Sequence, residues 1–347
     1  MARSSDPRNL TFGTFNLYNL QSPGKVWRGK TYSEAEYRAK IAWSAEALRR
    51  LDADVIGFQE LWSPDCLHDL FDMAQLSDSY ELIFIKDSGE GWYDIAVSAA
   101  LRKPWIVRQK RLHKNFGDGF RLIKRGGTRD PEDNEIRVQI DIFSRTVIDL
   151  EIAHPEHPEV PPIRCFFAHL KSKLSTRLDQ EEQAVDAIRN NASALGAAIS
   201  TIRRTAEAAA LRDILGQALR DSDTPVVLVG DLNDGEHSNT VAILTEQPSY
   251  RLFEGSRTGF RSDRGLYAAS RLQAYRMIGA TEHTHEHDGE REILDHVLVS
   301  EQFYDHSDNR LWSFEQMRIW NDHVADTDPA SSDHGQVAAR FLWDPTD

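Results

Sequence analysis

The sequence predicts an α/β protein in which short apolar strands alternate with amphipathic helices. Residues 226–229, Val-Val-Leu-Val, are wholly apolar and too few for an independent helix, so they predict a strand buried on both faces. The stretches 10–16 and 55–60 predict two further strands. Between them, Ser33 and Glu36 form a capping box ahead of apolar residues at helical spacing, which predicts a helix that ends near residue 51.

Similar patterns predict elements along the rest of the chain. Pro64, directly after Ser63, is typical of the first position of a helix. Further strands are predicted at residues 80–86, 95–101, 139–152, 163–169, 293–299 and 336–342. A long helical stretch is predicted over 176–220, where apolar residues recur at intervals of three and four, and Gly196 or the pair Asn190-Asn191 allows a break. This stretch either packs on its own sheet or offers a seam for an oligomer.

Composition limits the environment and the partners of the chain. It has 347 residues, 40% of them apolar, which suffices for one large domain or two smaller ones. A formal net charge of −14 gives no general attraction to nucleic acid or to an anionic membrane. We find no apolar run of membrane-spanning length and no signal-peptide pattern. The only cysteines, Cys66 and Cys165, fit reduced thiols, so we expect a soluble, cytoplasmic protein.

One segment reverses the sign of the charge. Residues 102–129 contain ten Lys or Arg against a single acid, Asp118. Trp105, Phe116 and Phe120 are interleaved with these basic residues. Such a segment can neutralise backbone phosphates and stack on bases, although basic runs are also common on solvated faces.

Two other motifs leave alternatives open. Residues 24–31 match the phosphate-binding pattern GxxxxGK[ST], but they neither follow a strand directly nor open a helix. A basic surface loop is therefore the better interpretation. His283, His285 and His287 alternate, so in an extended segment they would share one face, a spacing that can ligate a metal ion. No cysteine or acidic ligand pattern accompanies these histidines.

Polar side chains stand at one end of several predicted strands. Asp231 and Asn233 follow the strand at 226–229 two residues apart, so extended geometry would aim both at the same face, and Gly230 is expected to let the backbone turn. A carboxylate and an amide held there suit the positioning of a nucleophile and the stabilisation of an oxyanion. The full set is Asn16, Glu60, His169, Asp231, Asn233, Asp295, Asp333 and His334.

The segments that carry these residues are TFN, QE, AHLKS, GDLND, LDHVLVS and SDHG, in this order from about residue 10 to 342. In them the sequence resembles the endonuclease/exonuclease/phosphatase superfamily, which has the DNase I-like fold. The resemblance implies a four-layered α/β/β/α sandwich with a long helical insertion, formed by a single domain over 8–345. It leaves a basic insertion at about 102–130 and the helical insertion at about 176–220 outside the family core.

The resemblance also implies a reaction, the hydrolysis of a phosphoester with Mg²⁺ or Mn²⁺ as cofactor. Asn16, Glu60 and Asp333 would hold the ion, because hard oxygen ligands suit such a cation.

The remaining residues of the set would act on the substrate and on the attacking water. Asp231, steadied by Asn233, would orient or deprotonate that water. His169 and His334 would donate hydrogen bonds to the non-bridging phosphate oxygens, and Asp295 would fix the tautomer of His334.

Two substrate classes remain. Abasic endonucleases of the family carry a tyrosine where His169 stands and an aspartate where Tyr18 stands, so repair of abasic DNA is disfavoured. The basic segment favours a nuclease-type phosphodiesterase, with substrate contacts expected from Lys171, Arg121, Lys124 and Arg125. The acidity of the whole chain favours the alternative, a phosphatase or phosphodiesterase for a small phosphorylated molecule such as a sugar, an inositol or a lipid headgroup.

Overall fold

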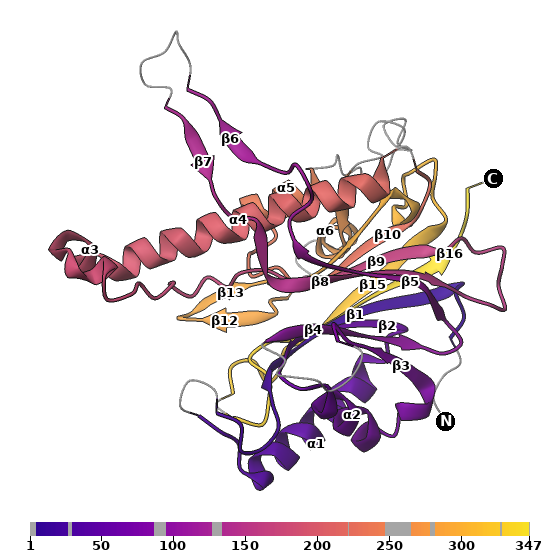
Figure 1. Cartoon of the computed structure of the whole chain (residues 1–347). Coiled ribbons are helices and arrows are strands. Elements are labelled where there is room, and N and C mark those ends of the chain that lie inside the picture. The colour runs from indigo at the N-terminus through magenta and orange to yellow at the C-terminus, as the bar shows by residue number, and fades with distance from the viewer. Residues whose placement is uncertain are drawn as a thin grey trace.

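The computed structural model describes residues 5–26, 30–86, 95–126, 134–220, 222–246, 265–277, 282–326 and 328–346. Within these ranges two six-stranded sheets pack face to face, and helices cover both outer faces (Figure 1). The predicted four-layered α/β/β/α architecture is confirmed.

Each sheet mixes parallel and antiparallel strands. In spatial order the first sheet contains β15 (Trp312–Trp320), β16 (Gln336–Trp343), β1 (Asn9–Leu20), β2 (Val55–Leu61), β4 (Ala96–Arg102) and β3 (Tyr80–Ile83). The second contains β11 (Tyr267–Ala268), β14 (Asp295–Val299), β10 (Val226–Asp231), β9 (Ile163–His169), β8 (Ile142–Ala153) and β5 (Ile106–Asn115). The pairs β1–β2 and β9–β10 are parallel.

The helices form the two outer layers. Helices α1 (Glu34–Leu51) and α2 (Pro64–Ala74) lie below the first sheet in Figure 1, whereas α4 (Ala192–Leu219) and α5 (Asn239–Thr245) lie above the second. The short α6 (Ala269–Arg276) follows β11. Single 3₁₀ turns occur at Ser77–Ser79, Glu182–Ala184 and Glu301–Phe303. Within the described ranges, none of the helices is long and apolar enough to cross a membrane.

Three apolar clusters hold the layers together, and β10 shows how one strand serves two of them. Val227 and Val229 pack into the central cluster between the sheets, while Val226 and Leu228 pack into the cluster under α4. Because side chains alternate along a strand, an apolar run buries both of its faces. The prediction of a strand buried on both faces is therefore confirmed. The third cluster lies between the first sheet and helices α1 and α2.

Local signals place most element boundaries. The capping box at Ser33 is present, with the Glu36 carboxylate bonded to the Ser33 backbone N–H, and α1 ends at Leu51. Several boundaries differ from expectation. The strand at 80–86 ends at Ile83, the strand at 10–16 continues to Leu20, and the strands at 139–152 and 293–299 begin at Ile142 and Asp295. β10 does not turn at Gly230 but continues through it to Asp231.

Gly230 meets a different requirement. Its φ is +150°, and a Cβ there would lie 1.9 Å from the carbonyl oxygen of Ala168 on β9. The glycine therefore permits close packing of two parallel strands, rather than a turn.

The predicted helix over 176–220 is only partly continuous. Its first residues are not helical, a 3₁₀ turn and the five-residue helix α3 (Asp186–Asn190) follow, and α4 begins after the break at Asn191. Gly196 lies inside α4, where the backbone oxygen of Thr176 approaches it closely. The second half of α4 packs on its own sheet, as one of the two alternatives predicts.

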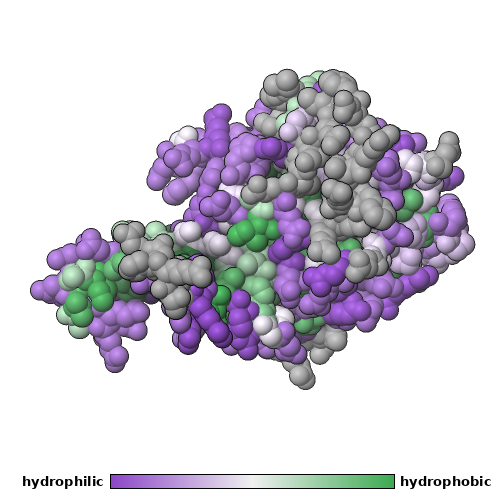
Figure 2. Space-filling model, turned by 90° about the horizontal axis from the view of Figure 1, so that it is seen from above, coloured by the Kyte–Doolittle hydropathy of each residue, from purple (hydrophilic) through white to green (hydrophobic). Residues whose placement is uncertain are grey.

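The first half of α4 projects from the body together with α3 (Figure 1). Hydrophobic residues gather toward the end of this arm (Figure 2), and Val185, Ile199 and Ile202 are between 40% and 53% exposed. An oligomer through this stretch stays a prediction.

The basic segment also divides into two parts. Strand β5 joins the edge of the second sheet by pairing with β8. Beyond it, β6 (Leu122–Lys124) and β7 (Ile136–Val138) form a two-stranded ribbon that stands away from the sheets (Figure 1). Residues 127–130 lie outside the described part of the chain. A second ribbon consists of β12 (His285–His287) and β13 (Glu290–Glu292).

Candidate active site

Strand register brings three of the predicted site residues together at one end of the second sheet. Asp231 at the end of β10 pairs with His169 at the end of β9 and with Asp295 at the start of β14. All three side chains lie on the face that packs between the sheets, because they share the parity of Val227 and Val229 along the strands. Each of them is at least 98% buried.

The first sheet contributes Asn16 from β1. This side chain is fully buried, and its Nδ2 donates to Oδ2 of Asp231 across the space between the sheets at 3.1 Å. Its Oδ1 accepts from the backbone N–H of Tyr18 at 2.9 Å, which fixes the amide orientation. The candidate site therefore spans both sheets.

Glu60 reaches the site through a local irregularity of β2. The pairing of β2 with β4 shifts register between Phe58 and Leu61, and Glu60 has a φ of +61°. Regular alternation would aim Glu60 at the helical layer, so the bulge redirects it. Its Oε2 accepts from the backbone N–H of Asn19 at 2.9 Å.

Asp231 is held in one orientation by Asn233. The backbone N–H of Asn233 donates to Oδ1 of Asp231 at 2.8 Å, and its Nδ2 lies 3.2 Å from Oδ2 and 3.1 Å from the oxygen of Leu170. Burial raises the pKa of Asp231 to about 7, although His334 opposes this shift. A carboxylate with a pKa near neutrality suits proton transfer.

The two histidines have opposite electrostatic surroundings. Burial works against the charged form of His334, but Asp295 and Asp231 outweigh it and raise the pKa of His334 well above its usual value. Burial, reinforced by Arg145, lowers the pKa of His169. Nε2 of His169 lies 3.5 Å from Oδ2 of Asp231, and Nδ1 of His169 is buried without a hydrogen-bond partner among the described residues.

Glu60 and Asp333 form the acidic side of the site. Burial and then the charge of Asp333 raise the pKa of Glu60, which shows that the two carboxylates repel each other. Oδ1 of Asp333 is buried and has no hydrogen-bond partner in the described part of the chain. Two such carboxylates fit a divalent cation with hard oxygen ligands, as predicted for this pair. The amide oxygen of Asn16 would complete the set while keeping its bond from Tyr18.

The combined geometry agrees with the comparisons to known proteins. The model of the Endonuclease/Exonuclease/phosphatase family matches residues 13–334. The chain belongs to this family. Its members are phosphoester hydrolases, and the DNase I-like fold predicted from the resemblance is confirmed.

Solved structures of other family members share the fold at low sequence identity. A Bacteroides vulgatus endonuclease/exonuclease/phosphatase superposes with a TM-score of 0.54 at 13% identity, covering 97% of this chain and 99% of that one. A Bacteroides thetaiotaomicron mannosyl-6-phosphatase gives 0.54 at 13%, covering 96% and 100%. TDP2 from Caenorhabditis elegans gives 0.51 at 13%, covering 96% and 75%. No curated protein matches the sequence.

The sequence does not predict two cations of the candidate site, the half-buried Arg145 and the buried Lys40. Arg145 on β8 donates through Nη1 to the oxygen of Leu170 at 3.0 Å, and its charge acts on Glu60 and Asp231. In the sequence Arg145 is marked only by its spacing of two residues from Phe143 and from Val147, which pack into the cluster under α4.

Lys40 is the second such cation. It is 99% buried within α1, and its Nζ donates to the oxygen of Ser331 at 3.1 Å. Burial lowers the pKa of Lys40 to about 8 against the opposing charges of Asp333 and Glu60. Helical spacing gives no sign that Lys40 faces inward toward a loop more than 280 residues later in the sequence.

The four residues predicted to bind substrate do not lie together. Nζ of Lys171 lies near the site but donates to the oxygens of Ser172 and Leu174 in its own loop. Arg121, Lys124 and Arg125 are exposed on or beside β6, in the ribbon that stands away from the sheets (Figure 1). The structure therefore does not bring these three into the buried cluster.

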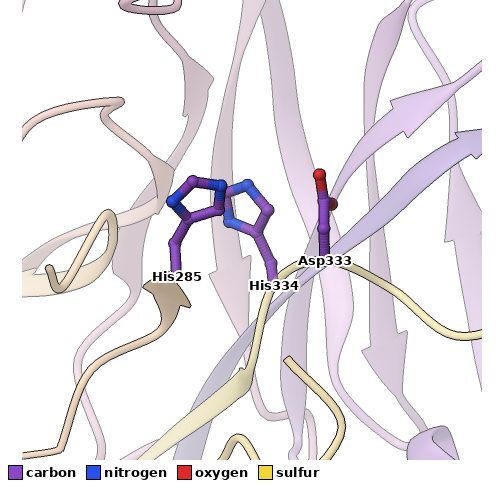
Figure 3. A group of neighbouring side chains, drawn as sticks. All are labelled: His285, Asp333 and His334. Carbon is purple, nitrogen blue, oxygen red and sulfur yellow. The ribbon is translucent and has the colours of Figure 1, made fainter. Parts of the chain in front are cut away.

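Among the alternating histidines only His285 approaches the cluster. Its ring lies beside that of His334 (Figure 3), with the two centroids 4.9 Å apart. The side chain of His287 is 79% exposed, and His283 lies against Asn321. The phosphate-loop-like motif at 24–31 lies partly outside the described residues, and the helix after it begins only at Glu34. That spacing agrees with the interpretation of a surface loop.

Proposed function

We propose that this family member is a Mg²⁺- or Mn²⁺-dependent phosphodiesterase that cleaves nucleic acid. One observation carries the chemistry. Asp231, fixed by Asn233, faces two imidazoles of opposite electrostatic character. The charge of Glu60 acts on Asp231, and that of Asp333 acts on Glu60.

In this proposal the chain's own groups divide the work. Asp231 accepts a proton from the attacking water, because its pKa near 7 permits transfer at neutral pH. His334, kept charged by Asp295, donates a hydrogen bond to a non-bridging phosphate oxygen, as does His169. Arg145 adds a fixed positive charge to the same region.

The metal site of the proposal consists of Glu60, Asp333 and the amide oxygen of Asn16. When bound, the cation supplies positive charge against the phosphate oxygens and the leaving group. The mutual repulsion of Glu60 and Asp333 supports a cation between them.

The β6–β7 ribbon supports nucleic acid as the substrate. The ribbon carries three exposed basic residues, Arg121, Lys124 and Arg125. Their position supports a ligand that extends beyond the buried cluster. Only an extended polyanion can contact this ribbon and the cluster at once, so a polymer explains both sets of residues.

A small phosphorylated molecule is the second candidate. The β12–β13 ribbon carries Glu286, Glu290 and Glu292 next to the site histidines, and such charges repel a polyanion. The formal net charge of −14 acts in the same direction. The neighbours include both TDP2 and a mannosyl-6-phosphatase, so the shared fold does not separate the two candidates.

A substrate panel tests the proposal. Wild type, Asp231→Ala and the exposed control Asp288→Ala are assayed with Mg²⁺ and with Mn²⁺ on plasmid DNA, single-stranded DNA, RNA, bis(p-nitrophenyl) phosphate and p-nitrophenyl phosphate. We expect cleavage of polymers by wild type and by the control, and a loss on the order of 10²–10⁴-fold in Asp231→Ala. Activity confined to the small esters would favour the second candidate, and cleavage of polymers that survives in Asp231→Ala would refute the mechanism.

A further inference from the structure

His285 reaches the catalytic cluster from outside the two large sheets. It begins β12, which pairs with β13 through the turn Asp288-Gly289, where both residues have positive φ. Figure 3 shows the rings of His285 and His334 side by side, with the Asp333 carboxylate next to them. One ligand atom from each of these three residues lies within 4.8 Å of the other two.

The position of His285 is fixed by the residue before it. Thr284 is fully buried, and its Oγ1 accepts from the backbone N–H of Leu294 at 2.9 Å and of Asp295 at 3.3 Å. The backbone oxygen of Thr284 accepts from Gly335 at 2.7 Å. His285 is thus bonded, through Thr284, to both segments that carry the Asp295–His334 pair. A ligand held in this way needs little reorganisation on binding.

Each of the side chains of His285, Asp333 and His334 has an atom that can bind a cation. Nδ1 of His334 is bonded to Asp295 at 2.7 Å, so Nε2 is the ring nitrogen left for an ion, which binds there by displacing the proton of Nε2. Oδ1 of Asp333 is buried without a partner among the described residues. Within the same residues, no hydrogen bond involves the His285 side chain. In most metal sites a histidine binds the ion through one ring nitrogen and donates the N–H of the other to a carboxylate or carbonyl oxygen. The hydrogen bond from His334 to Asp295 has this form.

We propose that His285, Asp333 and His334 form a second cation site, which binds Zn²⁺ or a similar transition ion. Two imidazole nitrogens and one carboxylate suit such an ion and leave an open position. Mg²⁺ prefers a shell of oxygens, so it is a poor occupant of this site.

Occupancy of the second site inhibits the enzyme. The ion displaces the proton of Nε2 of His334 into solvent, and the proposed function uses that proton for a hydrogen bond to the phosphate. The ion also binds Asp333, which that function assigns to Mg²⁺. This inhibitory effect rests on the proposed function, whereas the binding of the ion does not. His285 is then a regulatory ligand.

Binding is measured first, by calorimetric titration of Zn²⁺ into the full chain in excess Mg²⁺. His285→Ala removes the ligand, and His285→Phe removes both nitrogens while keeping a ring against His334. His287→Ala, on the same ribbon but with its ring exposed, is the matched control. We expect the affinity for Zn²⁺ to fall at least about 10-fold in both His285 variants and to stay within twofold of wild type in the control. Equal affinity in wild type and the two His285 variants, each with an unchanged melting temperature, overturns the site.

Inhibition is measured second, as activity in Mg²⁺ at increasing Zn²⁺, relative to the activity of each variant without Zn²⁺. We expect half-inhibition of wild type and of His287→Ala at the same concentration, and of His285→Ala at a concentration at least about 10-fold higher. Identical curves overturn the regulatory role. If no phosphoester is cleaved at all, the proposed function fails while the binding titration still decides the site.

Discussion

Nδ1 of His334 lies 2.7 Å from Oδ2 of Asp295, and the two residues come from different sheets. Asp295 begins β14 of the second sheet, and His334 precedes β16 of the first. Both are more than 90% buried, so this hydrogen bond is formed away from bulk water. The pair therefore links the packing of the sheets to the orientation of one imidazole.

Replacement of Asp295 by asparagine should impair catalysis more than stability. An amide at this position leaves the shape intact but no longer stabilises a charged His334. We expect kcat for bis(p-nitrophenyl) phosphate to fall on the order of 10²–10⁴-fold, with a melting temperature close to wild type. Asp288→Asn, on an exposed turn, is the control and should keep its activity. A kcat of Asp295→Asn within a few fold of wild type would contradict the role of the pair.

Gly230→Ala should displace Asp231 by forcing β9 and β10 apart. The added Cβ would lie 1.9 Å from the oxygen of Ala168, which is backbone and cannot move alone. We expect a loss of at least about 2 kcal/mol in the free energy of unfolding, measured with urea, together with lower activity. Gly119→Ala is the control, because its φ is +81° but nothing lies within 4 Å of a Cβ there. If both variants lose the same amount, backbone strain and not the close approach of β9 explains Gly230.

The sequence predicts that polar side chains gather at one end of the sandwich, where the candidate site lies, because strand periodicity is local. A polar residue at the end of an apolar strand must point either into a core or into a site, and Asn16, His169 and Asp231 follow this rule. Element order also follows from patterns of this kind, whereas the four layers are implied by the resemblance to the family.

Other features depend on contacts between distant segments. Lys40 faces inward only because the loop at Ser331 returns to α1, and Glu60 needs a bulge that no local propensity marks. The charge pattern predicts the basic segment as one unit, but its first part pairs with β8 and belongs to the sheet. Sequence spacing cannot supply such pairings, because they are set by the tertiary fold.

Asp149→Asn should make the stability of the protein less dependent on acid pH. The fully buried carboxylate of Asp149 accepts from Nε and Nη2 of Arg164 at 2.9 and 2.7 Å, and lies 3.1 Å from Nε2 of His113. Burial alone would raise the pKa of Asp149, but these bonds outweigh it and lower the pKa. Since the folded pKa lies below the unfolded value, the stabilisation is complete above the unfolded value and is lost as the pH falls through the folded one.

Urea unfolding at several pH values measures this effect. We expect wild type to exceed Asp149→Asn by about 3 kcal/mol at pH 7. The difference should shrink below about pH 4, the ordinary range of an aspartate pKa. Asp186→Asn, whose side chain is 79% exposed, should change stability by less than about 1 kcal/mol at either pH. A difference that stays constant with pH would show that the titration of Asp149 does not contribute.

Removal of the basic residues of the β6–β7 ribbon separates the two candidate substrates. In Arg121→Ala/Lys124→Ala/Arg125→Ala, we expect weaker binding of nucleic acid and a logarithmic salt dependence of the binding constant shallower by about 2–3. Hydrolysis of bis(p-nitrophenyl) phosphate should stay near wild type, because the ribbon lies outside the buried cluster.

The change in total charge needs a control of the same size. Arg38, Arg49 and Arg50 are exposed on α1, on the opposite side of the sandwich (Figure 1), so their replacement by alanine removes three positive charges without touching the ribbon. A salt dependence that is altered equally by both triple variants would reflect net charge alone, since long-range fields do not depend on which face loses the charge. An effect confined to the ribbon variant requires phosphates to lie against β6. A polymer bound at Asp231 can extend to β6, whereas a sugar phosphate bound there cannot.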